Sequence, residues 1–60
     1  MVMVYMVVKN GEIIIVTRSY RNAAHEYEGC IYKGKNNDII ALYNRKDGEE
    51  NWSLAKKDWL

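Results

Sequence analysis

The residues from Val2 to Val8 are almost all apolar, so a strand formed by them is apolar on both faces. Asn10-Gly11 follows this segment directly, and Glu12 to Arg18 is a second run rich in β-branched residues. Asn-Gly between two such runs favours a two-residue hairpin turn, because both residues adopt positive φ readily. The pattern therefore predicts an N-terminal β-hairpin whose first strand must be covered on both sides.

The pattern is less regular in the middle of the chain. Ser19 to His25 could form one helical turn but is too short for an independent helix, so we expect an ordered loop. Glu26 to Lys33 alternates between charged and apolar or small residues, which predicts a third strand with a bulge at Gly29. Lys35-Asn36-Asn37 supplies the turn that follows it.

Two more strands are expected near the C-terminus. Asp38 to Arg45 contains an apolar run and predicts the fourth strand, and Asp47-Gly48 predicts a second two-residue hairpin turn. Trp52 and Leu54 alternate with polar residues, as in a half-buried fifth strand, and 56–60 is then a short 3₁₀ turn. A short helix with Ser53 as its N-cap is the alternative, and it would place Trp52, Ala55 and Trp59 on one side.

These elements predict an all-β protein: a small antiparallel five-stranded barrel or bent sheet, in one domain over residues 1–60. The segment from Tyr43 to Trp59 resembles the end of an SH3-like barrel, with a strand, a distal Asp-Gly hairpin, a strand and a 3₁₀ turn that carries the acidic-aromatic pair Asp58-Trp59. The resemblance implies that fold and a preference for binding over catalysis.

Composition narrows the choice of function. Nine basic and eight acidic side chains leave a net charge of +1, which gives no global field for nucleic acid or an acidic membrane. The single cysteine, Cys30, excludes an intramolecular disulfide and a multi-cysteine zinc set, so we expect no metal and no cofactor. The apolar segment from Met1 to Val8 is too short to span a membrane, so we expect a cytoplasmic protein.

The sequence gives little support for a catalytic pair. His25 and Cys30 match no local signature of a nucleophile and its base, and a free cysteine is usually a small packing residue. Glu26 and Glu28 would share one face of the predicted strand, where exposed carboxylates are more common than a glycosidase pair. The four glycines are scattered and form no phosphate-binding loop. We therefore expect no enzymatic activity.

Binding is the better expectation. Aromatic and arginine side chains are enriched at the energetic centres of interfaces, and we expect the partner-binding residues to be Arg18, Tyr20, Arg21, Tyr27, Tyr32 and Trp59. The doubly apolar first strand exceeds what so small a core can bury. It predicts a homodimer with the interface residues Val2, Val4, Met6 and Val8.

The partner is expected to be a larger protein. The small size and the many Lys, Asn, Ile and Tyr residues, a bias typical of AT-rich genomes, resemble phage-encoded inhibitors of host or anti-phage defence proteins. Such an inhibitor acts by stoichiometric binding, in the host cytoplasm. The alternative is a small nucleic-acid-binding barrel in which Arg18 and Arg21 contact phosphates while Tyr20 stacks on a base, with Lys33 and Lys35 extending the patch.

The interpretation of Cys30 as a packing residue can be tested directly. Replacement of Cys30 by Ala or Ser should lower the free energy of unfolding by about 1 kcal/mol, a common size for a single substitution, and leave any biological activity intact. Urea denaturation and the activity assay measure the two quantities. Loss of all activity in a normally folded Cys30→Ser protein would contradict the interpretation and support a catalytic thiol.

Overall fold

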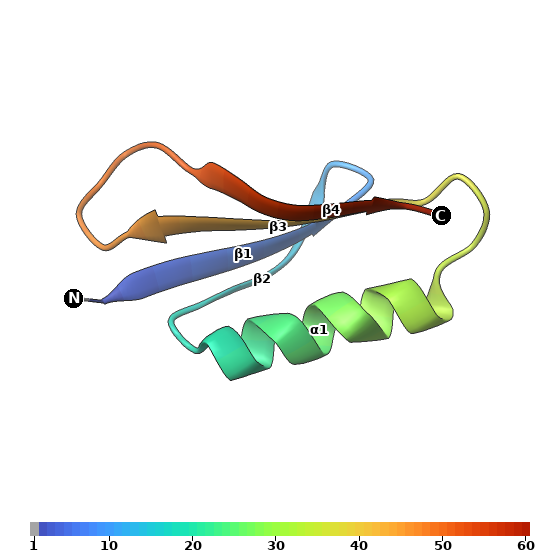
Figure 1. The fold of residues 1–60 in the computed structure, drawn as a ribbon, viewed down its shortest axis with the longest axis horizontal. Helices are drawn as coiled ribbons and strands as arrows, with labels where there is room; N and C mark the ends of the chain where they lie inside the picture. The colour runs from blue at the N-terminus through green and yellow to red at the C-terminus, as the bar shows by residue number, and fades with distance from the viewer. Residues whose placement is uncertain (1) are drawn as a thin grey trace.

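The computed structural model describes residues 2–60, and within them the chain forms four strands and one helix (Figure 1). In chain order the elements are β1 (Met3–Lys9), β2 (Glu12–Thr17), α1 (Tyr20–Lys33), β3 (Ile39–Lys46) and β4 (Ser53–Trp59). The prediction of a small, mainly antiparallel β protein is confirmed at this level, but one of the five expected strands is replaced by the helix.

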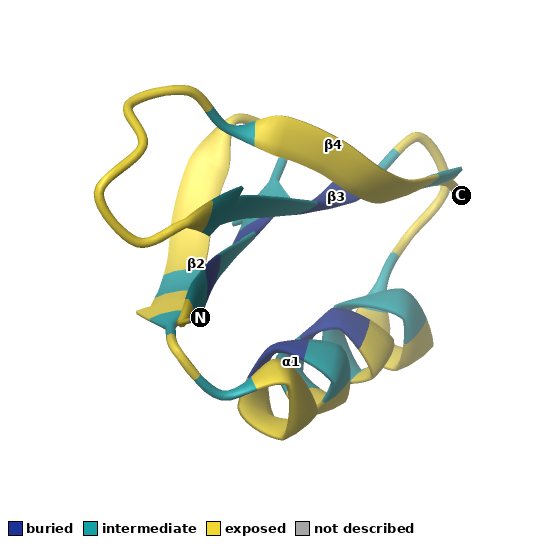
Figure 2. Cartoon of the chain, turned by 60° about the vertical axis from the view of Figure 1, so that its left-hand side comes forward, coloured by how far each residue is buried: buried dark blue, intermediate teal, exposed yellow. Residues whose placement is uncertain are grey.

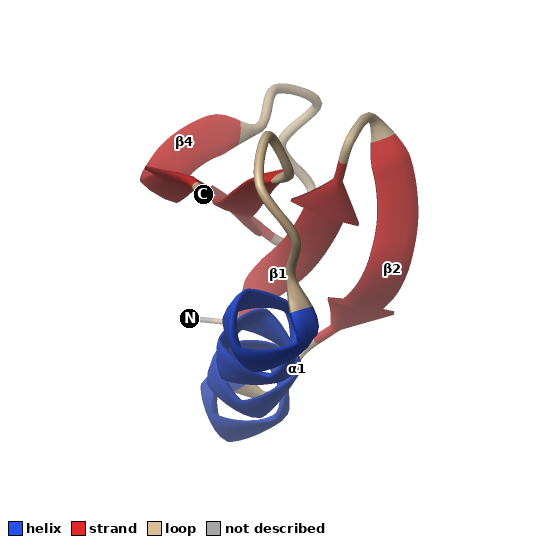
Figure 3. Cartoon of the chain, turned by 90° about the vertical axis from the view of Figure 1, so that its right-hand side faces the viewer, coloured by secondary structure: helices blue, strands red, loops and turns tan. Residues whose placement is uncertain are grey.

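The strands form one antiparallel sheet in the order β2-β1-β3-β4, so β1 and β3 lie in the centre and β2 and β4 form the edges. Helix α1 lies on one side of this sheet, and no element of residues 2–60 lies on the other side (Figure 3). The sheet is open, since β2 and β4 do not pair, and it therefore does not form the SH3-like barrel that the C-terminal segment suggested.

The predicted N-terminal hairpin is confirmed. Asn10 and Gly11 have φ angles of 52° and 80°, the positive values that the two-residue turn requires. The register runs from Lys9 opposite Glu12 to Tyr5 opposite Thr17, with a bulge on β2 between Ile13 and Ile15. The sequence signal succeeds here because the turn chemistry is local.

The prediction of a loop over 19–25 and a strand over 26–33 is wrong, because both segments belong to α1. Ser19 is the N-cap, and its side-chain oxygen accepts a hydrogen bond from the backbone N–H of Asn22 at 3.2 Å. Ala23 and Tyr27 lie one turn apart on the buried side, at the spacing that defines a helix face. Gly29 is an interior helix residue and not a bulge.

The C-terminal half follows the prediction more closely. Strand β3 nearly coincides with the expected strand, and Gly48 has a φ of 94° in the connection that follows, which spans 47–52 rather than two residues. Strand β4 continues to Trp59 where a 3₁₀ turn was expected, so the alternative of a helix begun by Ser53 is excluded. The chain then ends against the helix, since a Cβ atom at Gly34 would collide with the Leu60 side chain.

The core lies between α1 and the two central strands. It contains Val7, Ala23, Tyr27, Ile40 and Leu42, with Tyr5, Ile15, Cys30, Ile31 and Leu60 packed around them. Because side chains alternate along a strand, this assignment puts Val4, Met6 and Val8 on the opposite face of β1. The sheet therefore has a covered face and an open face.

Within the described residues no helix is long and apolar enough to cross a membrane.

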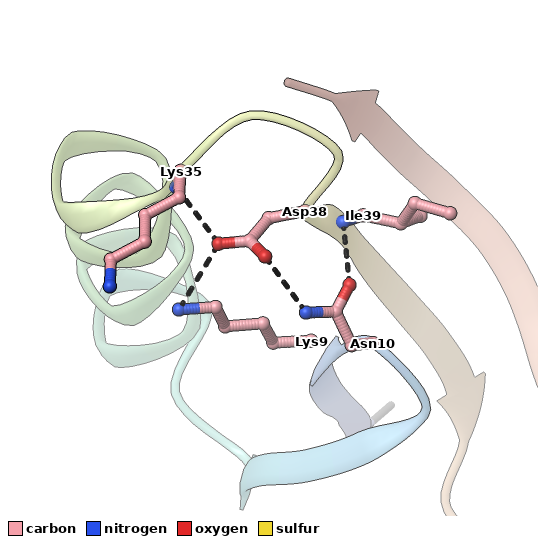
Figure 4. A network of polar contacts seen from close by, with 5 residues as sticks. All are labelled: Lys9, Asn10, Lys35, Asp38 and Ile39. Atoms are coloured by element: carbon pink, nitrogen blue, oxygen red, sulfur yellow. Dashed lines mark hydrogen bonds and ion pairs between the residues drawn. The ribbon is translucent and has the colours of Figure 1, made fainter.

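A polar network ties the first hairpin to the loop between α1 and β3 (Figure 4). The Asn10 side-chain amide donates to an Asp38 carboxylate oxygen at 3.0 Å, and its carbonyl oxygen accepts from the Ile39 backbone N–H at 2.9 Å. The second Asp38 oxygen accepts from the Lys35 backbone N–H at 2.9 Å and lies 3.6 Å from the Lys9 ammonium. These contacts lower the pKa of Asp38, the Lys35 hydrogen bond most, followed by Asn10, with Lys9 contributing less.

This shift predicts how acid affects the fold. The pKa of Asp38 in the folded state lies below the ordinary value, so the unfolded state binds more protons as the pH falls below about 5. Stability should fall progressively until the pH passes the folded pKa, and Asp38→Asn should make this dependence shallower. Urea denaturation at several pH values checks the slope, and carbon NMR titration of the Asp38 carboxyl checks its pKa. A midpoint at or above 3.8 would contradict the assignment.

Candidate functional site

A groove runs between α1 and the edge strand β4. The helix packs on β1, β2 and β3, whereas β4 lies beyond them at the side of the sheet (Figure 2). A helix is about 10–12 Å wide, while four strands spaced by about 4.8 Å form a sheet about 19 Å wide. One helix therefore leaves part of the covered face unfilled, and the gap falls beside β4.

One side of the groove is a stripe along the helix. Tyr20, Ala24, Tyr27 and Ile31 follow the spacing i, i+4, i+7, i+11, which places them on one helical face. They line two adjoining hollows of about 410 and 60 Å³, with Tyr27 shared by both. From Tyr20 to Tyr32 the groove spans about 18 Å along the helix axis. It is an elongated surface rather than an enclosed chamber.

Tyr27 forms the floor of the groove. Its ring is 2% exposed, and its hydroxyl lies 2.5 Å from an Asp58 carboxylate oxygen and 3.4 Å from the Ile40 carbonyl oxygen. One hydroxyl proton cannot be donated to both, so the shorter contact is the hydrogen bond. Burial raises the pKa of Tyr27 well above its ordinary value, and the Asp58 hydrogen bond and charge raise it further. The hydroxyl therefore stays protonated and holds α1 to β4.

The β4 side of the groove supplies charge. The Lys56 ammonium lies 5.0 Å from the centre of the Tyr27 ring, close enough for a cation–π contact. Asp58 lines the same hollow from β4, and Glu28 lines it from the helix. The groove thus combines the exposed rings of Tyr20 and Tyr32 with one cation and two carboxylates, a set suited to holding the side chains of a polypeptide.

The structure brings together three of the six predicted partner-binding residues. Tyr20 and Tyr32 stand at the two ends of the groove, 60% and 91% exposed, with Tyr27 between them. Arg21 is exposed on the first turn of the helix. Trp59 is 73% exposed and pairs with Ile39, which places it on the open face of the sheet, away from the groove.

Arg18 lies apart from the groove, beside the end of β3. Its guanidinium forms an ion pair with Asp47 at 3.2 Å, next to a hollow of about 330 Å³ that Val4, Val16 and Arg45 also line. The Arg45 guanidinium lies 4.8 Å from the Trp52 ring centre and donates to the Glu49 carbonyl oxygen at 3.1 Å. Both guanidiniums near this hollow are therefore already engaged with protein groups.

The residues considered as catalytic pairs all lie on α1, and the members of each pair point in different directions. Residues five apart on a helix point about 140° away from each other, so the exposed His25 does not face Cys30, which packs beside the core. Glu26 and Glu28, expected on one face of a strand, point about 160° apart on α1 for the same reason. Within residues 2–60 no group of three or more His, Cys, Asp and Glu side chains could hold a metal ion.

The predicted dimer residues belong to the open face. Met6 and Val8 are half-buried there, Val4 is buried, and Val2, just before β1, is 49% exposed. Strand β1 is central, so these residues can meet a second molecule only through the face and not through a strand edge.

The sequence interpretation missed the residues that complete the groove: Ala24, Glu28, Ile31, Leu42, Lys56 and Asp58. The helical members carry a signal that was available, because Tyr20, Ala24, Tyr27 and Ile31 repeat with a helical period. The β4 members carry none, since their position beside the helix depends on the order of the strands.

Comparison of the chain with protein-family models, with curated proteins and with solved structures finds no match.

The hydrogen bond at the groove floor gives a test of its structure. Tyr27→Phe removes the donor to Asp58 and should lower the free energy of unfolding by about 1.5–3 kcal/mol, the usual range for a hydrogen bond to a charged group. A double-mutant cycle with Asp58→Ala, which removes the acceptor, followed by urea denaturation, isolates the pair. Additive effects of the two substitutions would show that the contact contributes nothing.

Proposed function

We propose that the protein is a small, non-enzymatic protein-binding module that holds a segment of its target in the groove between α1 and β4. The observation that supports this best is Tyr32, which is 91% exposed beside a hollow whose floor is the buried Tyr27 ring. An exposed tyrosine ring costs little entropy to fix and buries a large area on binding, which is why tyrosine is frequent in energetic centres of interfaces.

The charges of the groove make it selective. Lys56 and Asp58 lie on the strand side and Glu28 on the helix side, so a target segment gains most if it carries complementary charges around an apolar centre. Tyr20 at the far end of the groove extends the contact to a length that several residues of a target can occupy.

The class of target is proposed from composition. The small size and the bias toward Lys, Asn, Ile and Tyr support a phage-type inhibitor that acts on a host or anti-phage defence protein by stoichiometric binding in the cytoplasm. A module of this size can block a larger protein simply by occupying its surface, and it requires no cofactor to do so.

Nucleic-acid binding through Arg18 and Arg21 is the weaker alternative. The Asp47 carboxylate competes with a phosphate for the Arg18 guanidinium, because the two are already 3.2 Å apart. The Tyr20 ring, which would stack on a base, makes an edge-to-face contact with Tyr5 at a centroid distance of 5.4 Å. The two arginines and the tyrosine therefore do not form one free surface.

Affinity capture from cells of the natural host tests the proposal. The wild-type protein should retain a specific protein, identified by mass spectrometry, and Tyr32→Ala should weaken the binding of that purified target by about 2 kcal/mol, as expected for an interface centre. Lys33→Ala is the matched control, because Lys33 is exposed on the next position of the same helical turn and lines neither hollow of the groove.

The salt dependence of binding distinguishes nucleic-acid binding from the proposed protein binding. Binding of labelled single- or double-stranded DNA or RNA through phosphate contacts should weaken steeply with salt, and Arg18→Ala or Arg21→Ala should each reduce the slope by about one unit. Tight nucleic-acid binding with this behaviour, or target binding that Tyr32→Ala leaves unchanged, would contradict the proposed function.

A further inference from the structure

The open face of the sheet is apolar across all four strands. The pairing registers align Val16, Met6, Tyr43 and Leu54 in one row that crosses β2, β1, β3 and β4 in turn. A second row contains Ile13, Val8 and Ala41 and ends at Lys57. Opposite residues of an antiparallel sheet point to the same face, so these rows form one continuous surface.

The edge-strand part of this surface is exposed in the single chain, whereas Val4 and Ala41 on the central strands are each 5% exposed. Ile13, Val16, Leu54 and Trp59 are 59%, 52%, 54% and 73% exposed. The charged members of the face lie at its margins, Lys57 on the edge strand and Arg45 at the far end of β3. Their long side chains can reach solvent while the centre is covered, because Lys and Arg lay their apolar stems along such a surface.

The whole chain exposes more surface than a compact monomer of its size. Its accessible surface is 4502 Å², whereas the scaling for monomeric proteins gives about 4,100 Å² at this mass. A fold with one layer of sheet and one helix on one side of it explains the excess, since half of the sheet has no second layer.

The area of the open face is near the lower limit for a dimer interface. Four strands at a spacing of about 4.8 Å and seven residues at about 3.3 Å each define a plane of about 19 by 23 Å, or about 440 Å². Two such planes bury about 900 Å² before the relief of the side chains is counted, and that relief has to bring the area above the roughly 1,000 Å² that a specific interface should exceed.

We infer that a second copy of this chain covers the open face, so that two sheets stack about a two-fold axis with the helices outside. A 60-residue chain buries only about 60% of its unfolded surface, and small domains commonly add a disulfide, a metal or a second subunit. Cys30 is free, and residues 2–60 contain no cluster for a metal ion, so the subunit is the remaining route. A second copy is present whenever the chain is made, whereas a target is not.

This arrangement extends the N-terminal hairpin interface to all four strands. It is independent of the proposed groove, which lies on the helix side and stays accessible in both subunits. The dimer would therefore present two identical grooves on opposite outer faces.

Sedimentation velocity between about 1 and 500 μM tests the inference. The wild-type chain should approach twice its 7.1 kDa mass. Val16→Lys and Leu54→Lys, at opposite edges of the face, should each weaken association by roughly 100-fold, because each charge enters a two-fold interface twice and one such site is worth about tenfold or more. Asn22→Lys, on the exposed side of α1, adds the same charge and should leave the mass unchanged. Circular dichroism confirms that each variant is folded.

An NMR experiment locates the contact. In a mixture of carbon-13-labelled and unlabelled chains, filtered NOEs should connect methyl groups of Met6, Val16 and Leu54 between molecules, and none should involve α1. A chain that stays at 7.1 kDa at 500 μM would overturn the inference. So would a dimer that both lysine variants leave intact. A Trp52→Phe chain that stays monomeric and whose Trp59 fluorescence responds to a labelled oligothymidine or to anionic vesicles would also overturn it, since the face would then have another occupant.

Discussion

The width of one helix limits how much of the four-stranded sheet is covered. Helix α1, 14 residues long, packs on the two central strands and β2. It is too narrow to fill the space beside β4 as well. The groove and the hydrogen bond across it follow from this unfilled space. The groove is the unfilled part of the covered face, and Tyr27 reaches across it to Asp58. The other face of the sheet carries no second element, and its side chains are exposed mainly on the edge strands.

The sequence was informative where the signal is local. Asn10-Gly11 between two apolar runs needs positive φ at both positions, and a hairpin is the structure that uses it. The segment 26–33 was misassigned because Tyr27, Gly29 and Ile31 fit a period of two, while the helical period becomes visible only when Tyr20 and Ala23 are counted with them. The segments 19–25 and 26–33 are each too short to show the helical period, which extends across His25 and begins at the N-cap Ser19.

The candidate site was predictable in part for a similar reason. Tyrosine side chains could be chosen as contact residues from their chemistry alone, and three of the chosen six line one groove. Their partners Lys56 and Asp58 could not be found, because they meet the helix through the pairing of Leu42 with Lys56 and of Ile40 with Asp58. The ion pair of Arg18 could not be predicted for the same reason, since its partner Asp47 is 29 residues away in sequence.

The strand order has a consequence for how the chain folds. Each hairpin, β1 with β2 and β3 with β4, closes a short loop and pairs neighbours in sequence, but the central seam joins Met3 to Lys46 and Lys9 to Ile40. Closing that seam requires most of the chain to be ordered at once, so its loop entropy should set the height of the kinetic barrier. Asn10 and Asp38 lie at one end of the seam, where the Asn10 side chain hydrogen-bonds to Asp38 and Ile39. The chain contains no proline, so prolyl isomerisation adds no slow phase to this step.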